Sequence, residues 1–587
     1  MRHGCAMKKF KVFKFILLVK TLFIFTGCSD SSTSLIPPSS FNLQSVEASA
    51  DKTKTLKYTW SKAEGATSYD LCEKESTYAN NCLVLATQTV STDATQTIEY
   101  TLPTLLVTDD FITKDYFIRA SNAAGISLSS EISISESTLI AAIGYLKASN
   151  VDANDVFGSA IALSKDGTTL AVSAPLEDSS SESIQADNSA TEAGAVYVFH
   201  YQNGTWGTPD YVKPFNIDAG DVFGFSLSLS SDGTVLAVGS LNESSGDVSI
   251  PSDNTAGASG AVYVYRYTSG AWSTPDYLKA SSITASDNFG RTVSLSGNGL
   301  TLAVGVPGED SGTSSPSDNS QGDAGAVYVF RYSGSVWGSP DYLKATDINA
   351  NDAFGVSVAL SEDGNRLAVG APNDDSNSVP TDNSGVDVGA VYVFDYLGSA
   401  WSTPDFVKAS NMSNSDQFGF NLALSSDGNT LAVGVPNEDS SSATTPDESA
   451  SAAGATYVYR YSGGSWGAPD YIKASNIDAD DEFGTWVSLN SNGTVLAVGA
   501  KNEDSSGISD NNDSLNSGAV YIYRYESNTW GTASLIKASN VDAGDLFGSS
   551  LQLSNDGNSL FVGATFESSD SLNQNNDATA SGAVYSY

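Results

Sequence analysis

The sequence predicts an all-β protein in which one repeated unit occupies most of the chain. The dipeptide Phe-Gly recurs at residues 157, 223, 289, 354, 418, 483 and 547, so successive copies lie 64 to 66 residues apart. Each copy holds four candidate strands, and an Asp-Gly turn such as the one in SEDGN at 361–365 joins the first two. Seven units of four antiparallel strands predict a seven-bladed β-propeller, preceded by a small β-sandwich.

The N-terminal segment has the pattern of an export signal. Lys8, Lys9, Lys11 and Lys14 precede an apolar run that Lys20 interrupts, and small residues follow. The stretch FTGC at 25–28 resembles the lipobox of bacterial lipoproteins, which implies a signal peptide over residues 1–27 and lipidation of Cys28. The alternative is an ordinary secretory peptide. Residues 28–40 are then expected to be a polar tether that ends at two prolines.

Residues 41–137 are expected to form the β-sandwich, because apolar and polar residues alternate there between turns. The segment resembles a fibronectin type III domain at positions 60, 69, 116, 122, 125 and 130, and Tyr116 would be its tyrosine-corner residue. Cys72 and Cys82 lie ten residues apart, and an exported chain favours a disulfide between them over two buried thiols.

The ends of the repeat array predict a closed ring over residues 143–587. The last copy ends at Tyr587 without a fourth strand, whereas residues 143–149 read as a fourth strand with no copy before them. The strand at 143–149 would therefore complete the last blade and leave no open edge. An open solenoid is the alternative. Six copies carry an outer-strand tryptophan: Trp206, Trp272, Trp337, Trp401, Trp466 and Trp530.

The copies resemble the FG-GAP repeats of integrin α-subunit propellers and of related bacterial surface proteins. The copy at 354–394 reads FGVSVAL, LAVGAP and GAVYVF in the order that this family shows. Integrin-type repeats often carry a DxDxDG calcium loop between the first two strands. The compact SEDG or SSDG turn of this chain is too short to surround a cation.

Two acidic features of each copy are candidates for binding. An aspartate stands two residues before every Phe-Gly, either as a turn residue that accepts backbone N–H groups or as a calcium ligand: Asp155, Asp221, Asp287, Asp352, Asp416, Asp481 and Asp545. The connection between the second and third strands is long and polar, and is either a calcium-ordered binding loop or a solvated spacer. Most of these loops contain an Asp-Asn pair, at 187–188, 253–254, 318–319 and 382–383.

Composition excludes several classes of function. The 587 residues include 28 Lys and Arg against 68 Asp and Glu, and a net charge of −40 repels nucleic acid and anionic lipid. Four cysteines without a CxxC motif and two histidines supply neither a zinc site nor a histidine-based catalyst. The repeat arginines share one outer-strand position and cannot converge on the axis, so we expect no enzyme. Arg291 and Trp486 are the main departures from the repeat, and each is expected to be a local packing or surface variant.

These observations predict a monomeric cell-envelope lipoprotein, in the outer membrane and attached only through its lipid. The propeller loops would bind an envelope or extracellular protein or a glycan, with calcium as a candidate ligand of the loops. A secreted lactonase- or sialidase-like hydrolase and a purely structural envelope protein are the alternatives.

Overall fold

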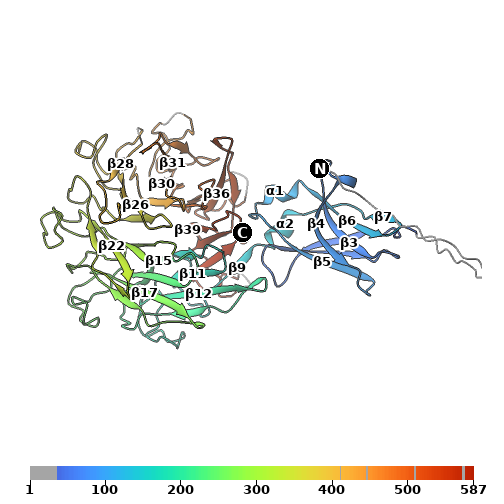
Figure 1. The fold of residues 1–587 in the computed structure, drawn as a ribbon, viewed down its shortest axis with the longest axis horizontal. Coiled ribbons are helices and arrows are strands. Elements are labelled where there is room, and N and C mark those ends of the chain that lie inside the picture. Colours follow the sequence, from blue (N-terminus) through green and yellow to red (C-terminus); the bar gives the residue numbers. More distant parts are fainter. Residues whose placement is uncertain (1–35, 410, 445–446, 508–510, 572–574) are drawn as a thin grey trace, which may run out of the picture.

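The computed structural model describes residues 36–587 except 410, 445–446, 508–510 and 572–574. Figure 1 shows two parts, a small β domain and a larger array of sheets in which strands from both ends of the array lie side by side. The signal peptide expected at 1–27, the lipidation site Cys28 and most of the tether lie outside the described residues. No helix within the described ranges is long and apolar enough to cross a membrane.

The small domain consists of two antiparallel sheets and two short helices. One sheet has the order β1-β2-β5, and the other has the order β4-β3-β6-β7, with β8 paired to β6. The elements are β1 Leu43–Ala48, β2 Thr55–Ser61, β3 Ser68–Lys74, β4 Cys82–Thr89, β5 Thr95–Thr101, α1 Thr108–Ile112, β6 Asp115–Asn122, β7 Gly125–Leu128, β8 Ile132–Ser133 and α2 Glu136–Ile140.

The core of this domain is aromatic. The tyrosine hydroxyl that bonds to a loop belongs to another tyrosine than the one expected from the sequence. Trp60 and Tyr69 are fully buried with ring centroids 5.2 Å apart. The hydroxyl that ties a loop is that of Tyr69, which accepts from Ala63 N at 2.8 Å, whereas Tyr116 packs its ring against Tyr58. Cys72 and Cys82 are joined by a disulfide. Residues 36–40 are not a free tether, since Ile36 O and Pro38 O accept hydrogen bonds from β6 and β7.

Seven further antiparallel sheets follow in chain order, here called sheets 1 to 7. Sheet 1 contains β10 Ile161–Leu163, β11 Thr169–Ala174, β12 Ala195–Gln202, β13 Thr205–Trp206 and β14 Asp210–Val212; sheet 2 contains β15 Phe223–Leu229, β16 Val235–Ser240, β17 Ala261–Thr268, β18 Ala271–Trp272 and β19 Asp276–Leu278. Sheet 3 contains β20 Thr292–Leu295, β21 Thr301–Val306, β22 Ala326–Ser333, β23 Val336–Trp337 and β24 Asp341–Leu343; sheet 4 contains β25 Ser357–Leu360, β26 Arg366–Ala371, β27 Ala390–Asp395 and β28 Asp405–Val407.

The last three sheets repeat the pattern, and sheet 7 takes its outer strand from the other end of the array. Sheet 5 contains β29 Asn421–Leu424, β30 Thr430–Val435, β31 Ala455–Ser462, β32 Ser465–Trp466 and β33 Asp470–Ile472; sheet 6 contains β34 Trp486–Leu489, β35 Val495–Ala500, β36 Ala519–Glu526, β37 Thr529–Trp530 and β38 Ser534–Ile536. Sheet 7 contains β39 Phe547–Leu553, β40 Leu560–Ala564, β41 Ala583–Ser586 and β9 Gly144–Leu146.

The expected single outer strand is split in most sheets. In sheet 2, for example, β18 pairs with the end of β17 and forms a small hairpin at Trp272, while β19 pairs with the beginning of β17. The second strands are almost wholly buried, because sheets cover both of their faces. Glycine permits this approach. A Cβ placed on Gly239 would lie 2.2 Å from Gly290 O of the next sheet.

The end of each sheet at the Phe-Gly dipeptide, here called the FG end, is bridged to its neighbour throughout the array. At every seam between sheets, the FG phenylalanine N–H donates to a carbonyl just before the third strand of the preceding sheet, at 2.9 to 3.2 Å. The series includes Phe157 N to Ser581 O, which joins sheet 1 to sheet 7. In sheet 7, β9 pairs with β41 in the register Val584↔Leu146 and Tyr585↔Tyr145.

The opposite end, here called the turn end, carries the tight turns between the first two strands. These turns are bridged in order by backbone hydrogen bonds of 2.8 to 3.0 Å, from Lys165 N to Ser231 O through to Ser491 N to Asn555 O. The small domain packs at this end. Lys54 Nζ donates to Asn558 O at 2.6 Å, and Asp110 lies 3.7 Å from Arg524 Nη2. The FG end therefore faces away from the small domain.

Candidate functional site

A buried lysine–glutamate pair lies beneath the FG end of six sheets. In sheet 5, Lys473 Nζ lies 2.8 Å from Glu438 Oε2, and both side chains are almost fully buried. The glutamate follows the second strand and the lysine lies at the end of the outer strand, so the pair ties the long loop to the sheet. The other pairs, at 2.7 to 3.0 Å, are Lys213–Glu177, Lys279–Glu243, Lys344–Glu309, Lys537–Glu503 and Lys147–Glu567.

Sheet 4 is the exception, because a shorter carboxylate occupies the glutamate position. Asp374 accepts from the Tyr392 hydroxyl at 2.7 Å, and Lys408 donates to the Gly389 carbonyl instead. Burial lowers the pKa of Lys408 to about 8. Burial also lowers the pKa of the lysines that have a glutamate partner, although the carboxylate opposes the shift. The pairs are therefore expected to hold the loops in place rather than to carry charge on the surface.

The seven aspartates that precede Phe-Gly lie beside these pairs and are buried. Asp287, Asp352 and Asp416 accept backbone N–H groups three residues earlier, at 2.7 to 3.2 Å, as turn residues do. Five of the seven, however, have one buried carboxylate oxygen without a hydrogen-bond partner: Asp155, Asp221, Asp287, Asp416 and Asp545.

Burial, together with a neighbouring carboxylate in most sheets, raises the pKa of these aspartates. The value is about 8 for Asp155, Asp287 and Asp481, and about 7 for Asp221, Asp352, Asp416 and Asp545. Each aspartate belongs to a different sheet. Within the described part of the chain, no three His, Cys, Asp or Glu side chains are grouped so as to hold a metal ion. Calcium ligation by these residues stays a prediction.

The long loops between the second and third strands, here called the rim loops, lie at the FG end and are anchored at their bases. The second residue after the glutamate is a serine that is fully buried, and in sheet 2 Ser245 Oγ donates to Ile250 O across the loop at 2.9 Å. The asparagine of the Asp-Asn pair joins the rim loop to the segment before Phe-Gly. Asn254 donates to Asp218 at 3.3 Å, and Asn383 donates to Asp347 at 3.0 Å. Both acidic features predicted from the sequence thus lie at the FG end, the aspartates buried and the rim loops above them.

The tips of the rim loops expose aliphatic side chains above these polar anchors. More than half of the residue surface is exposed at Ile184, Val248, Ile250, Val379, Val386 and Leu515. Anchored backbone and exposed apolar tips are features of surfaces that bind other molecules.

The axis of the array contains a second candidate site, a cavity of about 580 Å³ lined by the first strands of the sheets. Arg291 and Trp486 both line it, together with Lys501. Arg291 lies over the Phe225 ring at 4.8 Å, and burial lowers its pKa. The two departures from the repeat thus line the same cavity. No Asp, Glu, His or Cys is among the described residues that line it.

Sequence reasoning missed the lysine–glutamate pairs. The signal was present, because a lysine recurs in the outer strand of every repeat and a glutamate or aspartate recurs after the second strand. The sequence-based prediction that the repeat arginines lie on outer strands was wrong. The structure places them on third strands, at the seams between sheets: Arg266, Arg331, Arg460 and Arg524.

Comparison with known proteins supports the repeat assignment. Residues 142–199, 272–330, 337–394 and 466–523 match the FG-GAP repeat. Hydrazine synthase from Kuenenia stuttgartiensis is similar in structure with 13% sequence identity and a TM-score of 0.40, over 71% of this chain and 96% of that one. No curated protein matches the chain. The chain therefore contains FG-GAP repeats in an all-β fold.

Proposed function

We propose that the protein is a cell-envelope binding module whose rim loops engage a protein or glycan. In this proposal the seven sheets are the blades of a closed seven-bladed propeller, and residues 41–137 are a fibronectin type III-like stalk. Cys28 is the lipidated residue that attaches the stalk to the outer membrane. The proposal describes a monomer without enzymatic activity.

One observation carries this proposal: the rim loops lie at the FG end, opposite the end that contacts the small domain. An anchor before the small domain would therefore present the rim away from the membrane. The rim combines carboxylates and amides with exposed aliphatic tips, a mixture that suits a protein or carbohydrate partner. The described residues that line the axial cavity carry cationic, neutral polar and apolar side chains, and none is a carboxylate that could serve acid–base hydrolysis.

The test compares two sets of substitutions of similar exposure. Ile184→Ser, Ile250→Ser and Leu515→Ser together remove the exposed apolar tips of three rim loops, whereas Val336→Ser and Leu397→Ser remove exposed aliphatic groups from outer hairpins. Binding of each purified full chain to a glycan array and to immobilised envelope proteins is measured. The rim variant should lose at least about tenfold in affinity, and the hairpin variant should bind as the parent does. Equal binding by the rim variant would contradict the proposal.

Calcium binding by the rim loops is tested with the same purified full chain. If the loops bind calcium, millimolar calcium should raise the midpoint of thermal unfolding, because a ligand that binds the folded state stabilises it. Asp221→Asn and Asp287→Asn should reduce this shift. An unchanged midpoint would restrict the proposal to a metal-independent rim.

A further inference from the structure

Four seams between neighbouring sheets hold an arginine on an aromatic pair. The guanidinium carbon lies 3.6 to 3.9 Å from the centroid of a tyrosine ring and 5.5 to 5.8 Å from that of a tryptophan in the next sheet. A cation over two ring faces is an attractive arrangement that improves as water is removed. The arginines and their rings are Arg266 with Tyr332 and Trp337, Arg331 with Tyr396 and Trp401, Arg366 with Tyr461 and Trp466, and Arg460 with Tyr525 and Trp530.

At two of these seams the guanidinium also donates to the tight turn of the next sheet. At the seam between sheets 4 and 5, Arg366 Nη1 donates to Gly428 O at 3.1 Å and to Asn429 Oδ1 at 3.2 Å. Arg460 donates to Gly493 O, the equivalent carbonyl one seam further on, at 3.3 Å. At these two seams the arginine position consists of two rings and a turn carbonyl.

Within the described residues, the seam between sheets 7 and 1 has the rings and the turn without an arginine on them. Tyr201 and Trp206 have ring centroids 5.1 Å apart, as in the other sheets, and Gly167 and Thr168 occupy the turn positions of Gly428 and Asn429. Ser559 occupies the position of Arg366, because the second strands align as SLFVGA and RLAVGA. Among the described residues, no cationic group lies over Tyr201 or Trp206. Phe561 packs against Trp206 in a T-shaped arrangement, with ring centroids 5.4 Å apart.

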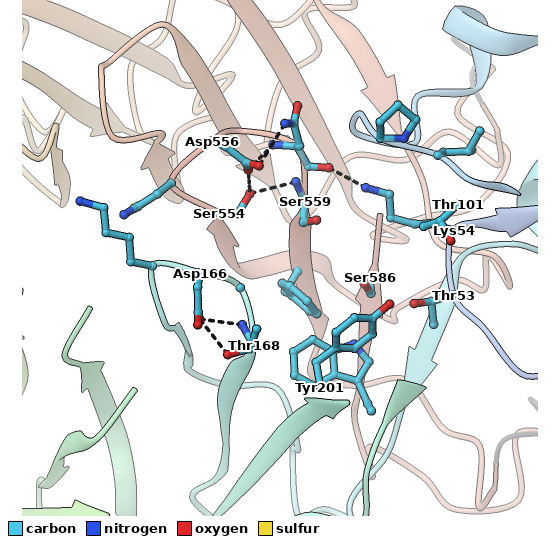
Figure 2. Close-up of a pocket in the computed structure, with 18 of the residues that line it drawn as sticks. Thr53, Lys54, Thr101, Asp166, Thr168, Tyr201, Ser554, Asp556, Ser559 and Ser586 are labelled. Carbon is cyan, nitrogen blue, oxygen red and sulfur yellow. Dashed lines mark hydrogen bonds between the residues drawn. The ribbon is translucent and has the colours of Figure 1, made fainter. Parts of the chain in front are cut away.

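A cavity of about 570 Å³ occupies this seam, and the small domain forms one of its walls (Figure 2). Tyr201, Trp206, Gly167, Thr168 and Ser559 all line it. The nearby lysines have other partners: Lys54 donates to Asn558 O, Lys165 is paired with Glu362, and Lys52 is paired with Glu99. Asp166 and Asp556 add negative charge to the lining (Figure 2).

We propose that this cavity binds an arginine side chain of another polypeptide. The guanidinium would lie on Tyr201 and Trp206 and donate to Gly167 O and to the Thr168 hydroxyl, as Arg366 does at its own seam. A planar, five-donor cation suits this position better than an ammonium group does. The cavity volume exceeds that of a guanidinium group and leaves room for the flanking peptide beside Thr53 and Pro103. This site lies at the turn end and is separate from the rim.

The experiment measures calorimetric binding of the acetylated, amidated tripeptide Gly-Arg-Gly to the full chain in detergent. The same peptide with lysine or with citrulline, and free L-arginine, are the comparison ligands. The arginine peptide should bind at least about tenfold more tightly than the lysine and citrulline peptides, because cation–π stacking and planar donors are both lost or reduced in those ligands. Binding of free L-arginine as tightly as the peptide would overturn the assignment to a polypeptide.

Variants of both sides of the seam complete the test. Tyr201→Leu should weaken binding at least about tenfold. Ser559→Arg should abolish it by supplying the guanidinium from within, and should also raise the midpoint of thermal unfolding. Tyr332→Leu removes the matching ring at a seam already filled by Arg266, and it should leave peptide binding unchanged. No measurable binding of the arginine peptide by the parent chain, or unaltered binding by folded Ser559→Arg, would overturn the proposal.

Discussion

The two ends of the sevenfold array are closed to different degrees. At the FG end all seven seams are bridged by backbone hydrogen bonds, whereas at the turn end six are bridged in the described structure. The seam between sheets 7 and 1 lacks the turn-end bond and holds a cavity against the small domain. The comparison indicates that the ring is held shut at the FG end, where β9, β41 and the Lys147–Glu567 pair meet.

The largest effect is expected when the lysine of the Lys147–Glu567 pair is removed. Lys147→Ala leaves Glu567 buried without its cation and should lower the free energy of unfolding by about 3–5 kcal/mol. Lys473→Ala breaks a pair of the same geometry within sheet 5 and should cost a similar amount. Hydrogen exchange should distinguish the two, because only Lys147→Ala should expose the amides of β41. Equal protection of β41 in both variants would show that the ring is closed by other contacts.

Two glycine substitutions compare the FG end with the turn end at the seam between sheets 7 and 1. A Cβ on Gly582, at the FG end, would lie 2.0 Å from Phe157 O, whereas a Cβ on Gly167, at the turn end, would meet nothing within 4 Å. Both residues have positive φ, so each alanine carries a backbone cost of about 1–2 kcal/mol. Gly582→Ala should cost about 3 kcal/mol in total, since the overlap adds to that term. Urea unfolding measures the loss in free energy of unfolding for both variants. Equal losses would argue against close packing at the FG end.

The buried aspartates predict an unusual dependence of stability on pH. Burial raises the pKa of Asp221 from 3.8 to about 7, so between these values the folded protein binds a proton that the unfolded chain does not. Stability contributed by this group is therefore greatest below pH 4 and is lost as the pH rises to about 7. The midpoint of thermal unfolding should accordingly rise when the pH is lowered from 8 to about 5.

The matched variants for this effect are Asp221→Asn and Asp232→Asn. Asp221→Asn removes the buried charge and should stabilise the protein by about 1–3 kcal/mol at pH 8 and flatten the pH profile. Asp232 caps a turn through Ser230 Oγ and Thr234 N, so Asp232→Asn should be neutral or destabilising. A steeper profile in Asp221→Asn would refute the assigned titration.

The smallest effect is expected for the ion pair that crosses the turn end. Lys165 and Glu362 lie 2.8 Å apart, but their side chains are 45% and 32% exposed. Lys165→Met should therefore change the free energy of unfolding by no more than about 1 kcal/mol, and less at high salt. A larger loss would mean that the turn end contributes to closure after all.

The sequence predicts the all-β repeat because its signals are local. Phe-Gly, the Asp-Gly turns and the apolar second strands recur at one spacing, and each depends on residues close together in the chain. The strand at 143–149 could also be predicted, since the missing seventh tryptophan indicated an outer strand from elsewhere.

Contacts between repeats could not be predicted in the same way. Arg366 and its ring partner Tyr461 are 95 positions apart, and Arg366 reaches the arginine position from a second strand rather than a third. Arg291 and Trp486 line one axial cavity for a similar reason, because only the arrangement of the sheets brings first strands together. The lysine–glutamate pairs could have been predicted from the sequence, since both residues recur. The glutamates were not distinguished, because acidic residues are abundant in every repeat.

The pairing of β9 with β41 also sets an order of events during biosynthesis. More than 430 residues separate the two strands, so the final sheet forms only after the ribosome has made the whole array. The small domain, which lies upstream and has its own aromatic core, is expected to fold before that moment. Pairing of β9 with β41 is then a late, long-range step. Before it occurs, the edge strands of sheets 1 and 7 are unpaired, and chaperones that cover them would act at that stage.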